Sequence, residues 1–192
     1  LNGIPIDACG EVGGDDFNEN GYYCGDLQVL QDIIDTNSSL EGQNTTDICC
    51  QEWVEGRLEE LNLAGDQLTS LPESISDLSN LKRLYIHNNH LSSLPESIGD
   101  LSNLERLELW GNQLTNLPES IGDLSNLEIL SSHYNQITSI PDNIANLNNL
   151  YHLSLNNNHI TYLSENICNL PISCDIYVYN NKLCEKYHYD CI

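Results

Sequence analysis

A unit of 23 residues repeats without a gap through the middle of the chain. Residues 81–103 read LKRLYIHNNHLSSLPESIGDLSN, and residues 104–126 read LERLELWGNQLTNLPESIGDLSN. In both units, leucine or isoleucine occupies positions 1, 4, 6, 11, 14, 18 and 21. One coil of this length cannot bury its own apolar side chains, but stacked coils share a continuous core, so the sequence predicts a solenoid. The units begin at Leu58, Leu81, Leu104, Leu127 and Leu150, and a degenerate sixth begins at Ser173.

Two positions of the unit carry polar residues that need an explanation. Position 9 is asparagine from the second coil onward and Asp66 in the first. An asparagine side chain offers an acceptor and two donors, so a stack of them can satisfy backbone groups where each strand turns away. At position 6, Ser132 replaces a branched apolar residue. We expect its hydroxyl to bond to the backbone or to a buried water.

The period, with leucine and asparagine at these positions, resembles the leucine-rich repeat family over residues 58–183. The resemblance implies an α/β solenoid: a right-handed superhelix with a parallel sheet on its concave side and short turns or helical pieces opposite. Upstream, a second set of residues resembles the amino-terminal cap of plant-type extracellular leucine-rich repeat proteins. These residues are Cys49, Cys50, Trp53, Gly56 and Arg57. That resemblance implies an extracellular or cell-surface protein.

We expect three parts along the chain. Residues 1–57 form a cysteine-containing amino-terminal cap, in which residues 26–35, DLQVLQDIID, place their apolar side chains on one face of a helix. Residues 58–172 hold five repeats. Residues 173–192 form a partial sixth repeat that merges into a cysteine-rich carboxyl-terminal cap, since terminal repeats meet water on one side and are atypical.

The cysteines gather at the two ends of the chain. They are Cys9, Cys24, Cys49, Cys50, Cys168, Cys174, Cys184 and Cys191. Two even groups predict disulfide bonds that staple both caps in an oxidising compartment. Zinc sites are disfavoured by the adjacent Cys49 and Cys50 and by the lack of a Cys-x-x-Cys motif.

The pairing inside each cap is only partly constrained by the sequence. Since adjacent cysteines rarely bridge each other, Cys49 and Cys50 should pair with Cys9 and Cys24, in either order. At the other end, loop length favours Cys168 with Cys174 and Cys184 with Cys191.

The charge excludes several partners. The chain has 29 acidic and 6 basic residues and a net charge of -23, and such a surface repels nucleic acids and anionic membranes. No apolar run approaches the length that spans a bilayer, so we expect no membrane insertion. Because the sequence starts at Leu1, we expect a mature or excised fragment. Two sequons, beginning at Asn37 and Asn44, favour secretion if the source is eukaryotic.

Oxygen-bearing residues alternate near the start of the chain. Asp16, Asn18 and Asn20 precede a glycine, as at the start of an EF-hand calcium loop. The last ligand of such a loop would fall on Leu27, so we assign that role to Asp26, one residue early. The alternative is a plain acidic turn. No other cofactor is expected, although stacked acids at position 16, from Glu73 to Glu165, could form either a solvated face or a cation ladder.

Positions 3, 5, 7 and 8 of each unit should face outward on the concave side, because alternate side chains of a strand point to opposite faces. Arginine and aromatic residues gather there, as in binding hot spots. The candidate ligand-binding residues are Arg83, Tyr85, His87, Arg106, Glu108, Trp110, His133, Tyr134, His152, Asn156, Tyr177 and Tyr179. We expect Trp110 to be the anchor, with an indole face for stacking, and Arg83 and Arg106 to offer donors to the ligand.

Catalysis finds no support in the sequence. No Ser-His-acid or Cys-His arrangement stands out, and His87 and His133 lie two coils apart, about 10 Å, which is too far for one metal ion. The sequence therefore predicts a non-catalytic module that binds a protein or glycan on its concave face. The alternative is a structural or adhesive extracellular component that self-associates or acts as a spacer.

Overall fold

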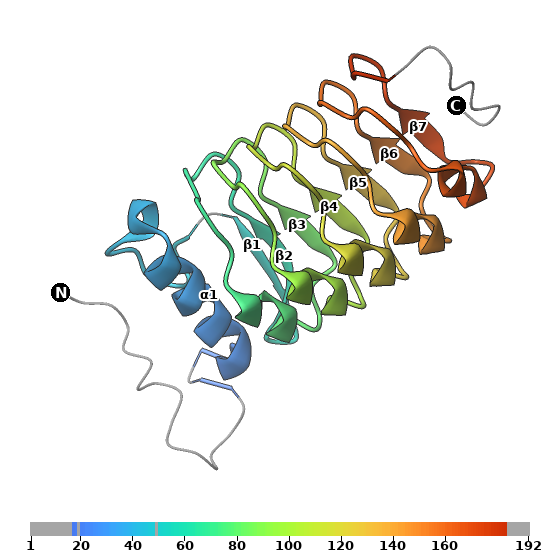
Figure 1. The fold of residues 1–192 in the computed structure, drawn as a ribbon. Coiled ribbons are helices and arrows are strands. Elements are labelled where there is room, and N and C mark those ends of the chain that lie inside the picture. Colours follow the sequence, from blue (N-terminus) through green and yellow to red (C-terminus); the bar gives the residue numbers. More distant parts are fainter. Residues whose placement is uncertain (1–16, 19, 49, 184–192) are drawn as a thin grey trace.

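In the computed structural model, we describe residues 17–18, 20–48 and 50–183 (Figure 1). Helix α1 spans Cys24–Thr36, and strands β1 to β7 span Gln51–Val54, Arg57–Asn62, Arg83–Tyr85, Arg106–Glu108, Ile129–Ser131, His152–Ser154 and Asp175–Tyr177. The 3-10 helices η2 to η7 span Ser38–Leu40, Glu73–Asp77, Glu96–Asp100, Glu119–Asp123, Asp142–Asn146 and Glu165–Asn169. The predicted helix over residues 26–35 is thus confirmed, with three further residues in α1.

All seven strands form one sheet in the order of the chain. From β2 to β7 every pair is parallel, and each pairs residues 23 positions apart, such as Leu61 with Leu84 and Leu84 with Leu107. Figure 1 shows the 3-10 helices as a second row that runs alongside these strands. The predicted leucine-rich repeat solenoid is confirmed. The antiparallel pair of β1 with β2 was not expected from the sequence.

The core follows the apolar columns of the repeat. Leu61, Leu84 and Leu107 each have 0% of their surface exposed, as do most residues at the other apolar positions. Ser132 is equally buried, and its hydroxyl donates to the carbonyl of Ser154 at 3.3 Å, as predicted for a backbone partner. Full burial of a leucine or isoleucine contributes about 1.5–3 kcal/mol, so these columns dominate the stability of the fold.

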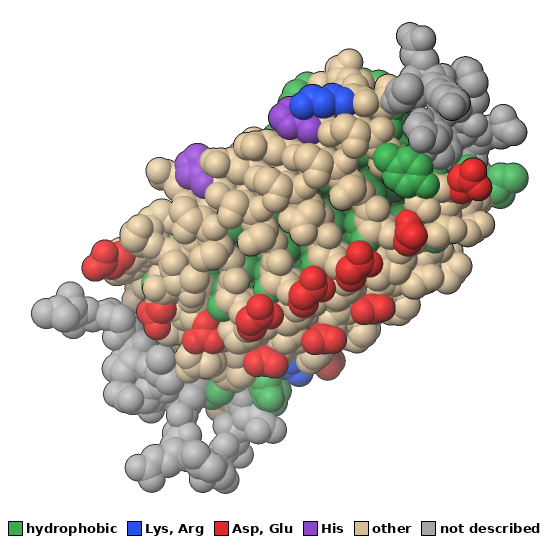
Figure 2. Space-filling view, in the orientation of Figure 1, with side chains coloured by type: hydrophobic (Ala, Val, Ile, Leu, Met, Phe, Trp, Pro, Cys, Tyr) green, Lys and Arg blue, Asp and Glu red, His purple; other side chains and the backbone are tan. Residues whose placement is uncertain are grey.

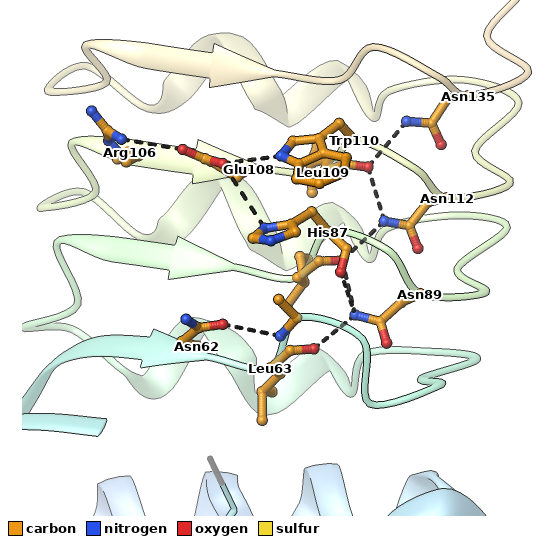
Figure 3. A network of polar contacts seen from close by, with 12 residues as sticks. Asn62, Leu63, His87, Asn89, Arg106, Glu108, Leu109, Trp110, Asn112 and Asn135 are labelled. Carbon is orange, nitrogen blue, oxygen red and sulfur yellow. Dashed lines mark hydrogen bonds and ion pairs between the residues drawn. The ribbon is translucent and has the colours of Figure 1, made fainter. Parts of the chain in front are cut away.

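The asparagines at position 9 form a buried ladder beside the core (Figure 3). Asn112 is typical: its Nδ2 donates to the carbonyls of Leu109 and Ile86, in its own coil and the preceding one. Its Oδ1 accepts from the backbone N–H of Leu91 at 3.0 Å. Asn89, Asn135, Asn158 and Asn181 repeat this pattern. Each asparagine therefore fastens its coil to the coil before it.

The first coil has Asp66 in place of this asparagine. Burial raises the pKa of the Asp66 carboxyl above its usual value. Because the folded-state pKa is higher than the unfolded one, the charged side chain opposes folding at neutral pH, and this cost is lost as the pH falls through the raised pKa. An ionised aspartate has no donor to offer, so the first coil lacks the amide donor of the other coils, and burial adds a small penalty for the charge of Asp66.

Helix α1 is tied to the sheet by an ion pair between Asp26 and Arg57. The carboxylate of Asp26 is fully buried and accepts from Arg57 Nε at 3.0 Å and Nη2 at 3.1 Å. It also accepts from the backbone N–H of Leu58 at 2.8 Å. The guanidinium of Arg57 lies over the ring of Tyr23, 4.1 Å from its centroid. The cap is thus joined to β2 through one charged cluster.

These contacts contradict the expectation that Asp26 is a calcium ligand, because both of its oxygens already have partners within the fold. The Oδ1 of Asn18 accepts from the backbone N–H groups of Asn20 and Tyr22, at 3.0 and 2.9 Å. This local turn fits the alternative of a plain acidic turn without a bound ion. Asp16 lies outside the described residues, so a calcium site at this turn stays a prediction.

The asparagine of the first sequon, Asn37, is buried in the fold. Asn37 is 1% exposed, and its Nδ2 donates to the carbonyls of Ile33 and Ser70. Its Oδ1 accepts from the backbone N–H of Thr69 at 2.8 Å. A glycan on Asn37 would break these bonds, so the fold disfavours glycosylation at this sequon. Asn44 lies half-buried in a turn, with its amide bonded to Asp47.

The structure corrects one disulfide expectation. Cys24 and Cys168 each take part in a disulfide bond. Cys174 is a free thiol, so the predicted bond between Cys168 and Cys174 is wrong. Cys174 packs against the core at the start of the last coil, and burial raises the pKa of its thiol to about 11. Cys9, Cys49, Cys184 and Cys191 lie outside the described residues, so the stapled caps stay a prediction.

Candidate binding site on the sheet face

The solvent side of strands β2 to β7, predicted as the concave face, is called the sheet face here. Five of the predicted residues form a continuous row of rings on it, and we call this set the ring row: Tyr85, His87, Trp110, His133 and Tyr134. They follow one another across β3, β4 and β5 because the parallel register places position 7 of each coil beside position 7 of the next. The sequence columns thus predicted their proximity correctly.

Trp110 lies at the centre of the ring row, between two histidines. Its ring is stacked on His87 at a centroid distance of 4.3 Å and 13°, and on His133 at 5.5 Å and 9°. The indole Nε1 donates to Glu108 Oε2 at 3.1 Å (Figure 3). Both faces of the indole are therefore covered, and the expectation of a free face for stacking is wrong. The half-buried indole presents its edge.

The carboxylate of Glu108 connects three side chains of the site. Besides the indole, it accepts from Arg106 Nη1 at 3.2 Å, and it lies 3.9 Å from His87 Nδ1 (Figure 3). Burial lowers the pKa of His87 below its usual value, against the opposing effect of the Glu108 charge. Burial also lowers the pKa of His133. Both imidazoles are consequently neutral at pH 7.

The two arginines of the sheet face differ in what they can offer. Arg83 forms ion pairs with Glu60 and with Glu52, the latter at 2.6 Å. Its Nε and Nη2 already donate to these carboxylates, so the prediction that Arg83 offers donors to the ligand depends on the rest of the guanidinium. Glu52 belongs to β1, and sequence reasoning missed it because nothing in the repeat pattern predicts that strand. Among the described residues, Arg106 has one carboxylate partner, and its side chain is 38% exposed.

Tyr134 is held in an unusual backbone conformation. Position 8 of each coil lies in the left-handed region, where the other coils have glycine or asparagine, such as Asn88 and Asn157. Tyr134 has a φ of 52° and is 61% exposed. A left-handed residue other than glycine costs about 1–3 kcal/mol unless its surroundings compensate, and such strain is typical of functional positions. The strain was readable in the sequence as a tyrosine in a glycine and asparagine column.

The remaining predicted residues lie toward the carboxyl-terminal end. The rings of His152 and Tyr177 are in contact at 5.2 Å, and His152 Nε2 lies 3.1 Å from the hydroxyl of Ser154. Tyr179 is 58% exposed, whereas Asn156 is only 6% exposed, which contradicts its assignment as a ligand contact. Among the described residues, no ring-to-ring contact joins this group to the ring row, although the charge of His152 affects the pKa of His133.

The row of 3-10 helices carries the acidic side chains. Each of η3 to η7 begins with a glutamate or an aspartate, and η3, η4 and η5 end with an aspartate. Figure 2 shows acidic side chains in lines along this flank. Among the described residues, no group of three or more histidine, cysteine, aspartate or glutamate side chains is placed to hold a metal ion. Within the same residues, no helix is long and apolar enough to cross a bilayer.

Comparison with known proteins identifies the repeat. A leucine-rich repeat protein of Leptospira interrogans is 41% identical, with a TM-score of 0.63 over 66% of this chain and 32% of its own. A plant ice-binding protein is 26% identical, with a TM-score of 0.73 over 85% of this chain and 58% of its own. This chain thus corresponds to less than two thirds of either protein. A chain of the BIR3–SERK2 complex from Arabidopsis thaliana is 27% identical, with a TM-score of 0.64 over 86% of this chain and 96% of its own.

A search of curated protein sequences found no match. The model of a protein family described as "Leucine-rich repeat region" matches residues 37–133, which is half of the chain. The matched residues run from the end of helix α1 to the coil that carries His133. The chain therefore belongs to the leucine-rich repeat family.

Proposed function

We propose that the chain is an extracellular, protein-binding recognition module whose ligand contacts the ring row of the sheet face. The observation that carries this proposal is the ring row itself, because nothing in the buried core requires three stacked rings and a strained tyrosine on the solvent side. The Arabidopsis neighbours support it: one is a complex of BIR3 with SERK2, and another is a receptor kinase ectodomain in complex with CASPARIAN STRIP INTEGRITY FACTOR 2.

The chemistry of the site favours a ligand with mixed polarity. The ring row offers aromatic edges, Arg106 offers donors, and Glu108 is an acceptor at the centre. Because Arg83 and Arg106 are each paired with carboxylates, the local charge is close to balanced on a strongly acidic protein. A purely anionic ligand would gain little here. A protein surface with apolar and carbonyl groups fits better, as at other hot spots.

Substitution of Trp110 by alanine is expected to weaken ligand binding by about 2 kcal/mol or more, the range of a hot-spot residue. The fold should persist because the indole lies on the sheet face, outside the core. The measurement is binding to an array of purified extracellular proteins and glycans, followed by titration of each hit.

Glu119→Ala on the acidic flank is the matched control. Tyr134→Asn removes a ring of the ring row and puts there the residue that other coils have at this left-handed position. Hits that lose affinity with Trp110→Ala and Tyr134→Asn but not with Glu119→Ala support the site. Equal affinity for all variants would place binding elsewhere. Sedimentation of the free protein adds a second test: a monomer supports a module, and self-assembly supports the structural component that the sequence also allowed.

A second candidate function is ice binding, favoured by a hydroxyl row on another surface. Position 12 of the first five coils holds exposed, uncharged side chains: Thr69, Ser92, Thr115, Thr138 and Thr161. The backbone N–H of Thr138 donates to Thr115 and that of Thr161 to Thr138, at 3.1 and 3.3 Å, which keeps the row regular. The coil spacing of about 5 Å makes this a periodic surface, and the plant neighbour is described as ice-binding.

If the hydroxyl row binds ice, the protein should inhibit ice recrystallisation, and lysine at both Thr115 and Thr138 should abolish the inhibition. Long charged side chains in the middle of the row would hold its other hydroxyls away from an ice surface. Trp110→Ala serves as the control and should inhibit as the unmodified protein does. Ice crystals that grow as in buffer alone would exclude this function without affecting the ring row.

A further inference from the structure

The two histidines of the ring row share a feature that the binding function does not use. In each, Nδ1 is buried and has no hydrogen-bond partner among the described residues. A neutral imidazole tolerates this, because it can keep its proton on Nε2 and leave Nδ1 as a lone pair. An imidazolium cannot, because both of its nitrogens carry a proton. Protonation of either ring would therefore create a buried donor that needs an acceptor.

The two rings differ in what they find when protonated. For His87, the carboxylate of Glu108 on β4 lies 3.9 Å from Nδ1, so a small movement would supply an acceptor. His133 follows β5, and within the described part of the chain its Nδ1 has no hydrogen-bond partner. Glu108 reaches it only as a charge from β4, while His152 on β6 and His87 after β3 oppose its protonation. On its own coil, the ring of Tyr134 packs edge-on against it.

We propose that the ring row is a pH-sensitive gate, in which protonation of His133 turns its ring away from Trp110 and uncovers one face of the indole. At neutral pH the row is closed and presents ring edges, and in acid it presents an aromatic face to a ligand. This inference rests on the proposed function only in assigning the uncovered face to the binding site. The gate itself is a property of the free protein.

The direction of the pH effect follows from burial. In the stacked arrangement, burial lowers the pKa of His133 below its usual value of 6.5. An imidazole that has turned out into solvent therefore binds a proton more readily than the stacked one. The closed row is therefore fully favoured above pH 6.5 and loses its advantage as the pH falls below that value. His87 has a lowered pKa as well, but Glu108 can hold its protonated ring in place.

The gate can be tested without any ligand. We would titrate the isotope-labelled protein from pH 8 to pH 5, follow the imidazole of His133 by NMR, and measure the access of acrylamide to Trp110 by fluorescence. Trp53→Phe leaves Trp110 as the sole tryptophan for fluorescence. NMR of the protein with both tryptophans gives a readout without that change, since each indole N–H has its own signal. We expect Trp110 to become accessible with a midpoint below pH 6.5, over about two pH units for a single proton.

Two matched variants decide which ring is the sensor. His133→Asn should leave Trp110 accessible at every pH, and His87→Asn should keep the transition. Protonation of His133 without any change at Trp110 would overturn the proposal, as would a transition that survives in His133→Asn. If the pH transition at Trp110 occurs as expected but the protein binds nothing on the array, the gate is supported and the proposed function fails.

Discussion

Replacing Asn112 with alanine lowers the free energy of unfolding by about 3 kcal/mol or more, on the expectation that each buried polar group left without a partner costs about 1–3 kcal/mol. The side chain is 7% exposed and serves three backbone groups: the carbonyls of Ile86 and Leu109 and the N–H of Leu91. These groups lie in two coils, so their loss also weakens the attachment of one coil to the next. In a solenoid, stability depends on such contacts between neighbouring repeats.

Chemical denaturation followed by circular dichroism measures this cost. Asn116→Ala is the control, because Asn116 is exposed on the same coil and accepts one bond from Thr115. Asn112→Asp is a sharper second variant, since an ionised carboxylate could accept from Leu91 but not donate to the two carbonyls. The ladder would be unimportant if Asn112→Ala and Asn116→Ala lowered stability equally.

The fold could be read from the sequence because its main interactions repeat at one period. Leu84 lies between Leu61 and Leu107 in the sheet for the same reason that the three residues are 23 positions apart. A residue in such a column meets its counterparts in the adjacent coils, so periodicity alone specifies the contact. The same logic placed Tyr85, His87, Trp110 and His133 near one another before the structure was known.

What periodicity cannot specify is the orientation of side chains and the contacts of the caps. The columns put Trp110 between two histidines, but whether its faces are open or covered depends on rotamers. Likewise, the pairing of Arg83 with Glu52 depends on β1, which lies outside the repeat. In the sequence, Asn37 begins a sequon, but in the fold its side-chain amide is buried. It bonds to the backbone of Ile33 in α1 and to the backbone of Thr69 and Ser70 in the first coil. These three features depend on contacts that do not recur from one coil to the next, so the repeat pattern cannot predict them.

The cap provides the second large expected effect. Asp26→Ala should lower the free energy of unfolding by about 3–5 kcal/mol, the cost of leaving one partner of a buried ion pair alone. The guanidinium of Arg57 would keep the hydroxyl of Ser79 and the ring of Tyr23 but no carboxylate, and the N–H of Leu58 would lose its acceptor. The effect should be concentrated in the cap, since Asp26 is in α1 and Arg57 begins β2.

Hydrogen exchange resolves where that stability is lost. Protection should fall in α1 and β2 of Asp26→Ala more than in β4 or β5, because neighbouring coils keep their own ladder bonds. Glu59→Ala is the matched control: its ion pair with Lys82 is at the surface, with 38% of the lysine side chain exposed, and should contribute less than about 1 kcal/mol. Changing Arg57 to methionine in the Asp26→Ala background should recover part of the loss, because it removes the unpaired charge. If the double variant were no more stable than Asp26→Ala, the cost would come from the N–H of Leu58 and from lost packing, and the ion pair would not be what fastens the cap to the sheet.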